Sequence, residues 1–335
     1  MREDAGGMPA EMTELMGTLR LRPGHRGSSR PPRLAPTSPR AYPAPAGHTP
    51  APGERMRDAV NVRQTTLAMR ALLAVAGVLV IGAGVPLFVL SDTTADHFAW
   101  TVQPALTAAA LGAAYWGASV LELVAARAKQ WAQARVAVPG VLAFTTLMNI
   151  PIFKNFENYH LDRPAAWAWI ATYLVVPPLM AGVLWHQLKQ PGGDPPRRRR
   201  LPTPLRGLVG LQGLGMLVFG LALLAVPTEV GALWPWGLDP ANSTYGGSEA
   251  LYFGCWLTGL GIVGVQATWE DDLDRLQGAF GAYLALGSFE LIASARYLDT
   301  MHEGLRTAAW WAALGVVMLT GVWGLAAGRL QKKAP

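Results

Sequence analysis

The chain has 335 residues, of which 51% are hydrophobic and only 15% are charged, and its formal net charge is +6. A soluble domain spreads charged side chains over its surface, whereas here they are segregated along the chain. This pattern excludes an ordinary soluble globular protein. The single cysteine, Cys255, excludes an intrachain disulfide framework.

The N-terminal segment is poor in apolar residues, and residues 1–55 hold ten of the 26 prolines. Such a segment cannot bury enough apolar surface to fold by itself, and it lacks the apolar core of a signal peptide. We predict a disordered, basic and proline-rich cytoplasmic tail over residues 1–68. A second interpretation is that translation starts at Met56, which leaves a short basic lead-in before the first apolar segment.

Eight apolar stretches follow, and they contain almost no Lys or Arg. Each is close to the roughly 20 residues that a helix needs to cross a bilayer core. Backbone groups in hydrocarbon must bond within their own segment, so these stretches are predicted to be helices. The third is the shortest. Their approximate bounds are 71–91, 104–126, 136–153, 165–187, 206–227, 248–268, 276–295 and 308–328.

Basic residues alternate between the connections. Beyond residue 55, one alternate set of connections holds sixteen Lys and Arg residues, whereas the other set holds four, namely Lys154, Arg163, Arg296 and Arg306. The positive-inside rule places the richer set in the cytoplasm. We therefore expect a multi-pass protein of the cell membrane with both termini cytoplasmic. No folded basic domain is present to bind nucleic acid.

Short signatures occur twice along the chain, at offsets of 136 and 143 residues. They predict an all-α integral membrane protein with about eight transmembrane helices, built as two tandem four-helix repeats over 69–187 and 206–330. Because each copy has an even number of spans, the two copies are parallel. The signatures are Trp100 with Pro104, Trp236 with Pro240, Arg163-Pro-Ala-Ala-Trp167 and Arg306-Thr-Ala-Ala-Trp310.

The connection between the copies, residues 188–205, is rich in Gly, Pro and Arg and predicts a flexible cytoplasmic linker. Its four consecutive arginines would each contribute about 1 kcal/mol to binding of anionic lipid headgroups. The alternatives are docking of a partner protein and a charge clamp that only fixes orientation. These residues are Arg197, Arg198, Arg199 and Arg200.

Glu290 is the ionisable residue that lies deepest in an apolar stretch. It follows Leu276 by about 21 Å of helix, and a carboxyl at that depth must be paired or protonated. Its counterpart in the first copy is near Asn149. We predict a polar cluster at the outer face that is either an anion-binding or proton-linked site, or a structural ion pair. Its members are Glu290, Asn149, Arg163, Arg306, Arg296, His160 and His302.

Motifs of soluble enzymes are missing from the sequence. Gly259, Gly261 and Gly264 match the spacing of a dinucleotide fingerprint, but they lie in the middle of a span, where small residues serve helix packing. The histidines have no spacing that is diagnostic of a metal site. We therefore expect no metal and no cofactor, and the sequence argues weakly against an enzyme.

The Trp-Pro-Trp236 segment with Pro240, the Trp269-Glu-Asp-Asp-Leu-Asp-Arg275 loop, and the usage of Ala and Arg resemble uncharacterised multi-pass membrane proteins of high-GC bacteria. The resemblance covers mainly residues 206–311. It implies a membrane location and no particular activity.

Two functions fit these observations. The first is transport or permeation of a small solute or ion at the interface between the repeats, with Glu290 as the gating or coupling group. The second is a non-catalytic accessory or scaffold protein, which docks partners or anionic lipid through its cytoplasmic loops. The lipid bilayer is the expected partner in both, together with a second copy of the chain or another membrane protein.

Overall fold

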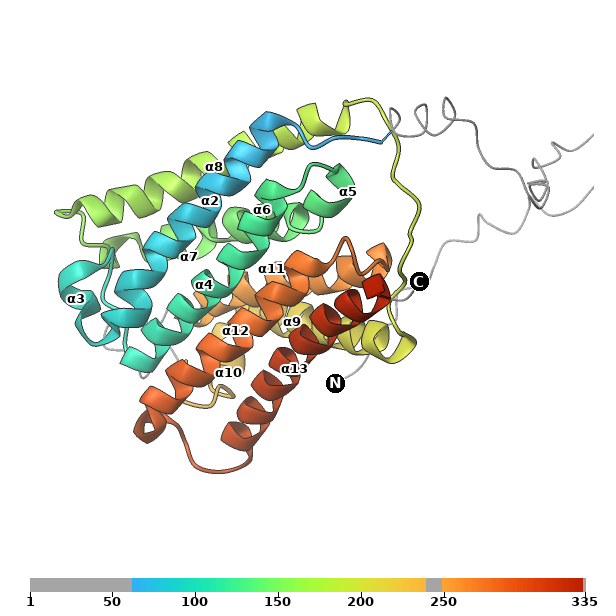
Figure 1. Ribbon diagram of the computed structural model, residues 1–335. Helices are drawn as coiled ribbons and strands as arrows, with labels where there is room; N and C mark the ends of the chain where they lie inside the picture. The colour runs from blue at the N-terminus through green and yellow to red at the C-terminus, as the bar shows by residue number, and fades with distance from the viewer. Residues whose placement is uncertain (1–61, 239–248, 334–335) are drawn as a thin grey trace, which may run out of the picture. The chain divides into compact units, whose positions relative to one another are not determined.

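A computed structural model of the chain describes residues 62–238 and 249–333 (Figure 1). Residues 1–61 of the predicted tail, the alternative start at Met56, and Pro240 lie outside the described residues. Every regular element within them is helical. Extended backbone contributes isolated bridges, such as Val62 with Gly193 and Trp100 with Tyr159.

Seven helices of the described residues are long and apolar enough to cross a membrane. The first continues as a π-helix over Val85–Val89, whose second residue is Pro86. The seven are α2 (Leu67–Gly84), α4 (Ala105–Arg127), α8 (Pro164–Leu188), α9 (Thr203–Ala225), α11 (Glu249–Glu270), α12 (Gln277–Arg296) and α13 (Leu305–Lys333).

The third predicted span is a shorter and broken helix. It consists of α6 (Val138–Leu147) and α7 (Asn149–Lys154). Pro151 has no N–H group to donate to the carbonyl of Leu147, so the α-helical ladder is interrupted where α6 ends. The structure therefore has seven long helices and one short apolar pair where the sequence predicts about eight spans.

Short helices form the connections, and they gather at two ends. We call the end with residues 62–66, 128–137, 189–202 and 271–276 the linker end, and the end with residues 85–104, 155–163, 226–238 and 297–304 the tryptophan end. The short elements are the 3-10 turns Ser91–Thr93, Phe156–Asn158 and Leu298–Thr300, and the helices α3 (Thr94–His97), α5 (Trp131–Ala134) and α10 (Pro227–Gly231).

The helices pack in a closed circuit. Each contacts the next in the order α2, α4, α12, α13, α9, α11, α6, α8 and back to α2. In Figure 1, α4 and α12 lie side by side although they belong to different halves of the sequence. The most apolar windows of α4 and α11 are each 78% buried, against 22% for α9 and 28% for α2. Thus α4 and α11 form the interior of the bundle.

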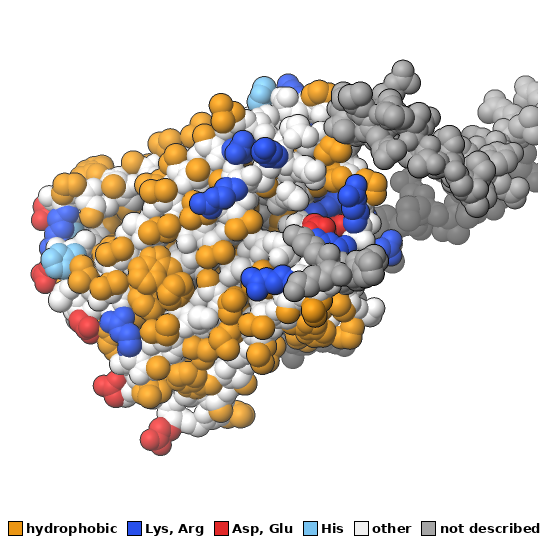
Figure 2. All heavy atoms as spheres, viewed as in Figure 1, with side chains coloured by type: hydrophobic (Ala, Val, Ile, Leu, Met, Phe, Trp, Pro, Cys, Tyr) orange, Lys and Arg blue, Asp and Glu red, His pale blue; other side chains and the backbone are white. Residues whose placement is uncertain are grey.

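Apolar side chains cover the outer faces of the less buried helices. Leu211 and Val218 on α9 are exposed, as are Val78 on α2 and Leu319 on α13. Figure 2 shows hydrophobic side chains spread over the visible face along the helices. Exposed apolar surface of this extent requires a partner, and hydrocarbon provides one. The structure is consistent with a membrane-embedded multi-pass protein.

Glycines let α9 and α11 approach closely, as the sequence predicts for the Gly259–Gly264 pattern. A Cβ atom on Gly213 would lie 2.6 Å from the backbone nitrogen of Val265, and one on Gly261 would lie 2.4 Å from that of Leu217. Backbone cannot move aside as a flexible side chain can. Helix packing in a membrane depends on such small residues.

Gly213→Ala is therefore expected to destabilise the fold by about 1–3 kcal/mol, the usual cost of overpacking. Gly207 lies on the same helix, and a Cβ there meets nothing within 4 Å. Gly207→Ala should be neutral or slightly stabilising, since Ala has the higher helix propensity. Denaturant unfolding in mixed micelles measures both. Equal stability of the two variants would contradict the close packing of α9 on α11.

Candidate functional site

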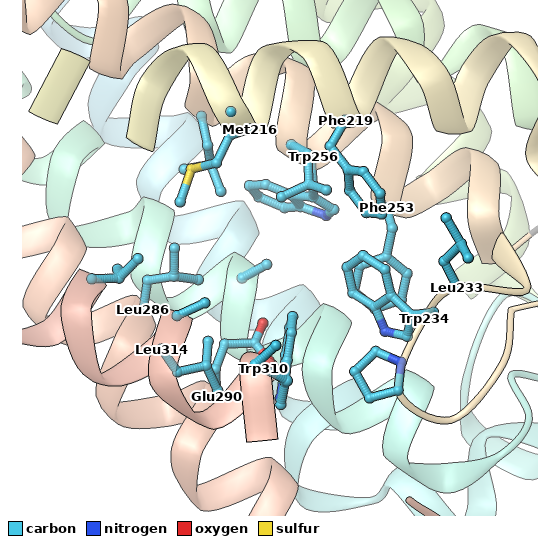
Figure 3. A pocket seen from close by; sticks show the side chains of 18 of the residues that line it. Met216, Phe219, Leu233, Trp234, Phe253, Trp256, Leu286, Glu290, Trp310 and Leu314 are labelled. Carbon is cyan, nitrogen blue, oxygen red and sulfur yellow. The ribbon is translucent and has the colours of Figure 1, made fainter. Parts of the chain in front are cut away.

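A cavity of about 480 Å³ lies between α9, α11, α12 and α13 (Figure 3). Its walls are almost entirely apolar. Within its lining, Glu290 and Arg306 are the ionisable residues. The other lining residues are Ala114, Gly215, Met216, Phe219, Leu233, Trp234, Pro235, Phe253, Trp256, Leu257, Leu260, Leu286, Ala309, Trp310, Ala313, Leu314 and Val317.

Glu290 reaches this cavity because of its position on α12. Tyr283, Leu286, Glu290 and Ala293 recur every three or four residues and are all buried, so they form one inward stripe. The side chain of Glu290 is directed toward the cavity beside Trp310 (Figure 3). Glu290 is only 4% exposed.

One oxygen of the Glu290 carboxyl has no partner among the described residues, as is also true of Glu122. Within the described residues, Oε2 of Glu290 is buried and accepts no hydrogen bond, and no basic side chain forms an ion pair with this residue. Buried polar groups in folded proteins are almost always bonded. An unbonded carboxyl beside a cavity therefore indicates a place where a bound molecule or a proton completes the site.

Aromatic rings form the wall near the tryptophan end. The ring centroid of Trp234 lies 4.8 Å from that of Phe253, 5.1 Å from that of Trp310 and 5.9 Å from that of Phe219. The indole N–H of Trp310 donates to Ser294 Oγ over 2.9 Å. Within the described residues, the indole N–H groups of Trp234 and Trp256 have no acceptor. The cavity thus presents several aromatic rings and few polar partners.

The predicted polar cluster is divided by the structure. Arg306 lines the cavity with Glu290, but its Nη1 donates to the carbonyl of Ala232 over 2.8 Å. Arg163 makes the same kind of bond, to the carbonyl of Ala95. Arg163 therefore ties the start of α8 to the connection between α2 and α4, and Arg306 ties the start of α13 to the connection between α9 and α11.

The other members lie elsewhere at the tryptophan end. Nη1 of Arg296 donates to the carbonyl of Phe88, and Nε2 of His160 bonds to Thr101 Oγ1 over 3.1 Å. His302 is exposed. None of these contacts brings the three side chains to Glu290.

Asn149, the residue predicted as the counterpart of Glu290, bonds to α8. Its Nδ2 donates to the carbonyl of Tyr173 over 3.0 Å, and its Oδ1 is buried without a donor in the described part of the chain. The side chain is thus already engaged by its own half of the bundle.

Two of the four linker arginines use their guanidiniums within the protein. Arg197 Nε donates to the carbonyl of Glu270 over 2.8 Å, and Arg199 pairs with Asp274. The backbone N–H of Arg198 donates to Asp272, whereas the side chains of Arg198 and Arg200 are exposed. The segment that the sequence predicts to be a flexible linker is therefore bonded to the acidic 270–274 loop.

Glu270 is the centre of this contact. Its carboxylate accepts hydrogen bonds from Arg135 at 2.5 and 2.8 Å and from Arg275 at 2.8 Å. Burial alone lowers the pKa of the Arg135 guanidinium, but its bonds to Glu270 and Asp194 raise that pKa above its ordinary value overall. Arg135 remains charged, and the pair persists.

Sequence reasoning located Glu290 but missed the aromatic wall. Trp234 and Trp310 lie close to the ends of apolar stretches, a position that is typical of interfacial anchors because Trp is enriched at both membrane surfaces. Trp234 is instead only 3% exposed. No periodicity in the sequence distinguishes an inward tryptophan from an anchoring one near a helix end.

Metal ligands are not grouped in the described residues: no set of three or more His, Cys, Asp or Glu side chains there is placed to hold an ion.

No protein-family model, curated protein or solved structure matches the chain. The function is therefore inferred from the chemistry of the site.

Glu270→Gln is expected to destabilise the protein by about 3–5 kcal/mol, because it leaves a buried guanidinium without its counter-charge. The side chains of Glu270 and Arg275 are 1% and 5% exposed. Asp162→Asn is the control, since Asp162 is 78% exposed and 3.9 Å from Arg163, and such pairs contribute under about 1 kcal/mol. Denaturant unfolding in micelles measures both variants. Similar small effects would mean that Glu270 does not hold the linker end together.

Proposed function

We propose that this polytopic membrane protein binds a small, largely apolar solute in the cavity of its second half and mediates the permeation of that solute. The observation that carries the proposal is the buried, unbonded carboxyl of Glu290 beside a cavity of about 480 Å³. Small-molecule sites have volumes of roughly 300–1,000 Å³ and mostly apolar walls with a few polar groups. A carboxyl at membrane depth is by default a functional residue.

The exposure of the lining supports access from the side of the bundle. Gly215 on α9 and both Ala309 and Ala313 on α13 line the cavity and are exposed. In a membrane these positions face lipid. An apolar solute dissolved in the bilayer then reaches Glu290 by passing between α9 and α13.

We also propose that the bundle consists of two copies of a four-helix unit, and the closed circuit of helix contacts supports this duplication. If α2, α4, α6 and α8 correspond to α9, α11, α12 and α13, the order of contacts is unchanged when the two sets are exchanged. Matched bonds at the tryptophan end support the same correspondence: Arg163 to Ala95 O, Arg306 to Ala232 O, His160 N to Ala99 O and His302 N to Pro235 O.

The two proposed copies differ in what fills the space between their helices. In the first, aromatic rings pack between α4, α6 and α8, with Tyr115 and Tyr173 each in ring contact with Phe144 and Trp169. In the second, the cavity lies beside Glu290. The solute site is therefore expected within the second copy, rather than along the interface between copies.

We further propose that the linker end faces the cytoplasm, because the richer set of Lys and Arg residues belongs to its loops. A scaffold function has less support. Arg197 and Arg199, which would contact lipid or a partner, bond to the 270–274 loop instead. Transport or permeation is the better supported of the two functions.

The first test is saturable binding of 1-aminoanthracene, measured by energy transfer from the cavity tryptophans to the probe. Gly215→Leu places a side chain where a Cβ meets nothing within 4 Å, so it fills the cavity without a clash. We expect affinity to fall by about tenfold or more, which corresponds to ~1.4 kcal/mol. Gly207→Leu, equally unobstructed but outside the cavity, should bind like the wild type. Unchanged binding in both variants would exclude the cavity as the site.

The second test is access from the membrane. In a Cys255→Ala background, which removes the single native thiol, Ala313→Cys should react with the lipid-soluble reagent N-phenylmaleimide, and 1-aminoanthracene should slow the reaction. Ala326→Cys is the control, because Ala326 is exposed on the same helix but does not line the cavity. It should react without protection by the probe. Protection at neither position, or at both, would contradict a solute that occupies this cavity.

A further inference from the structure

We propose that the ligand of the cavity is a lipophilic organic cation, in which alkyl or aryl groups surround a quaternary or substituted ammonium. This inference rests on the proposed function, since it names the class of molecule that the same cavity takes. Three properties of the site support it: the rings of its wall, the single carboxyl, and the scarcity of other polar groups.

The rings of the wall suit a cation. Trp234 lies within 6 Å, centroid to centroid, of Phe219, Phe253 and Trp310, and these rings come from α9, α11, α13 and the loop before α11. Aromatic faces attract ammonium groups, most strongly when water is excluded. A cluster drawn from four segments can surround a bulky cation rather than contact it on one side.

Among the described residues that line the cavity, Glu290 is the one group that can carry a negative charge. No basic side chain of the described residues forms an ion pair with it, so a bound cation can serve as the counter-ion of this carboxylate. Arg306 lines the same cavity but is held at the start of α13 by its bond to Ala232 O. Arg163 makes the matching bond to Ala95 O at the start of α8, which indicates that this arginine has a structural role.

Other ligand classes fit less well. An anion would be repelled by the carboxylate of Glu290. A polyhydroxylated solute would bury groups for which these walls offer few partners, and each unbonded polar group costs free energy. Ca²⁺ and Mg²⁺ require six or more oxygen ligands, whereas the described lining of this cavity offers one carboxyl. A cation shielded by apolar groups requires only ring faces and one carboxylate.

Glu122 provides a matched comparison within the same protein. It is 3% exposed, and its Oε2 is buried without a partner in the described residues, as in Glu290. The cavity beside Glu122, however, has a volume of only about 20 Å³, which holds no more than a water molecule or so. Glu122 is therefore a buried carboxyl without room for an organic ligand.

The experiment compares phenyltrimethylammonium with tert-butylbenzene, which has nearly the same shape and no charge. Each competes with 1-aminoanthracene for the purified full-length protein. We expect the wild type to prefer the cation by about tenfold or more. Glu290→Gln should lose this preference, Glu290→Asp should keep much of it, and Glu122→Gln should behave like the wild type. Proteoliposomes should also take up radiolabelled phenyltrimethylammonium under an inside-negative potential, and Glu290→Gln should abolish the saturable part.

The outcomes separate this inference from the proposed function. If both competitors displace the probe equally from the wild type, or Glu290→Gln keeps the preference, the cation assignment is wrong while the cavity remains a solute site. If neither displaces the probe and Gly215→Leu has no effect, the cavity is not a solute site and both proposals fail. Equal loss of preference in Glu122→Gln would trace the effect to buried carboxyls in general and overturn the assignment to Glu290. Retained probe binding by each variant shows that it is folded.

Discussion

The ion pairs at Glu270 connect the two halves of this bundle. Its carboxylate ends α11 and receives Arg135 from the connection after α4 and Arg275 from the connection after α11. Because Arg275 and the carboxylate are almost completely withdrawn from water, removal of the carboxylate leaves the buried Arg275 guanidinium without its counter-charge. The linker bonds to the same loop, through Arg197 to the carbonyl of Glu270. The crossing of the chain from α8 to α9 thus depends on a few buried charges.

The long helices follow from the sequence because apolar stretches of about 20 residues permit few other structures in hydrocarbon. The third span departs from this rule, since Pro151 removes one backbone donor and divides α6 from α7. The linker departs from it for a different reason. Its Gly and Pro content predicts flexibility, but the acceptors that bind Arg197, Arg198 and Arg199, one carbonyl and two carboxylates, lie more than 70 residues further along the chain. The composition of a short segment cannot predict hydrogen bonds to residues so distant in the sequence.

The sequence predicts one part of the candidate site, the carboxyl of Glu290, but not its surroundings. Glu290 is visible from sequence because a carboxyl in an apolar stretch is costly, and its place on the inward stripe of α12 follows from helical periodicity. The division of the predicted cluster does not follow from the sequence, since Arg296 and Arg306 bond to the carbonyls of Phe88 and Ala232, which are distant along the chain. Trp234 has the position of an interfacial anchor in the sequence, yet it is buried against four other rings. Whether a tryptophan near a helix end turns inward depends on how the loop folds back.

The linker also determines how the cavity can change shape. Arg199 Nη1 donates to the carbonyl of Gly328 near the end of α13, while Arg206 at the start of α9 bonds to the carbonyl of Thr268. Both α9 and α13, between which we propose that the solute enters, are therefore bonded to other parts of the protein at the linker end. If these helices moved apart, the separation would be smallest at the linker end and would stretch the Arg306 bond to Ala232 O at the other end. In such a motion the two helices would stay fixed at the linker end and separate at the tryptophan end.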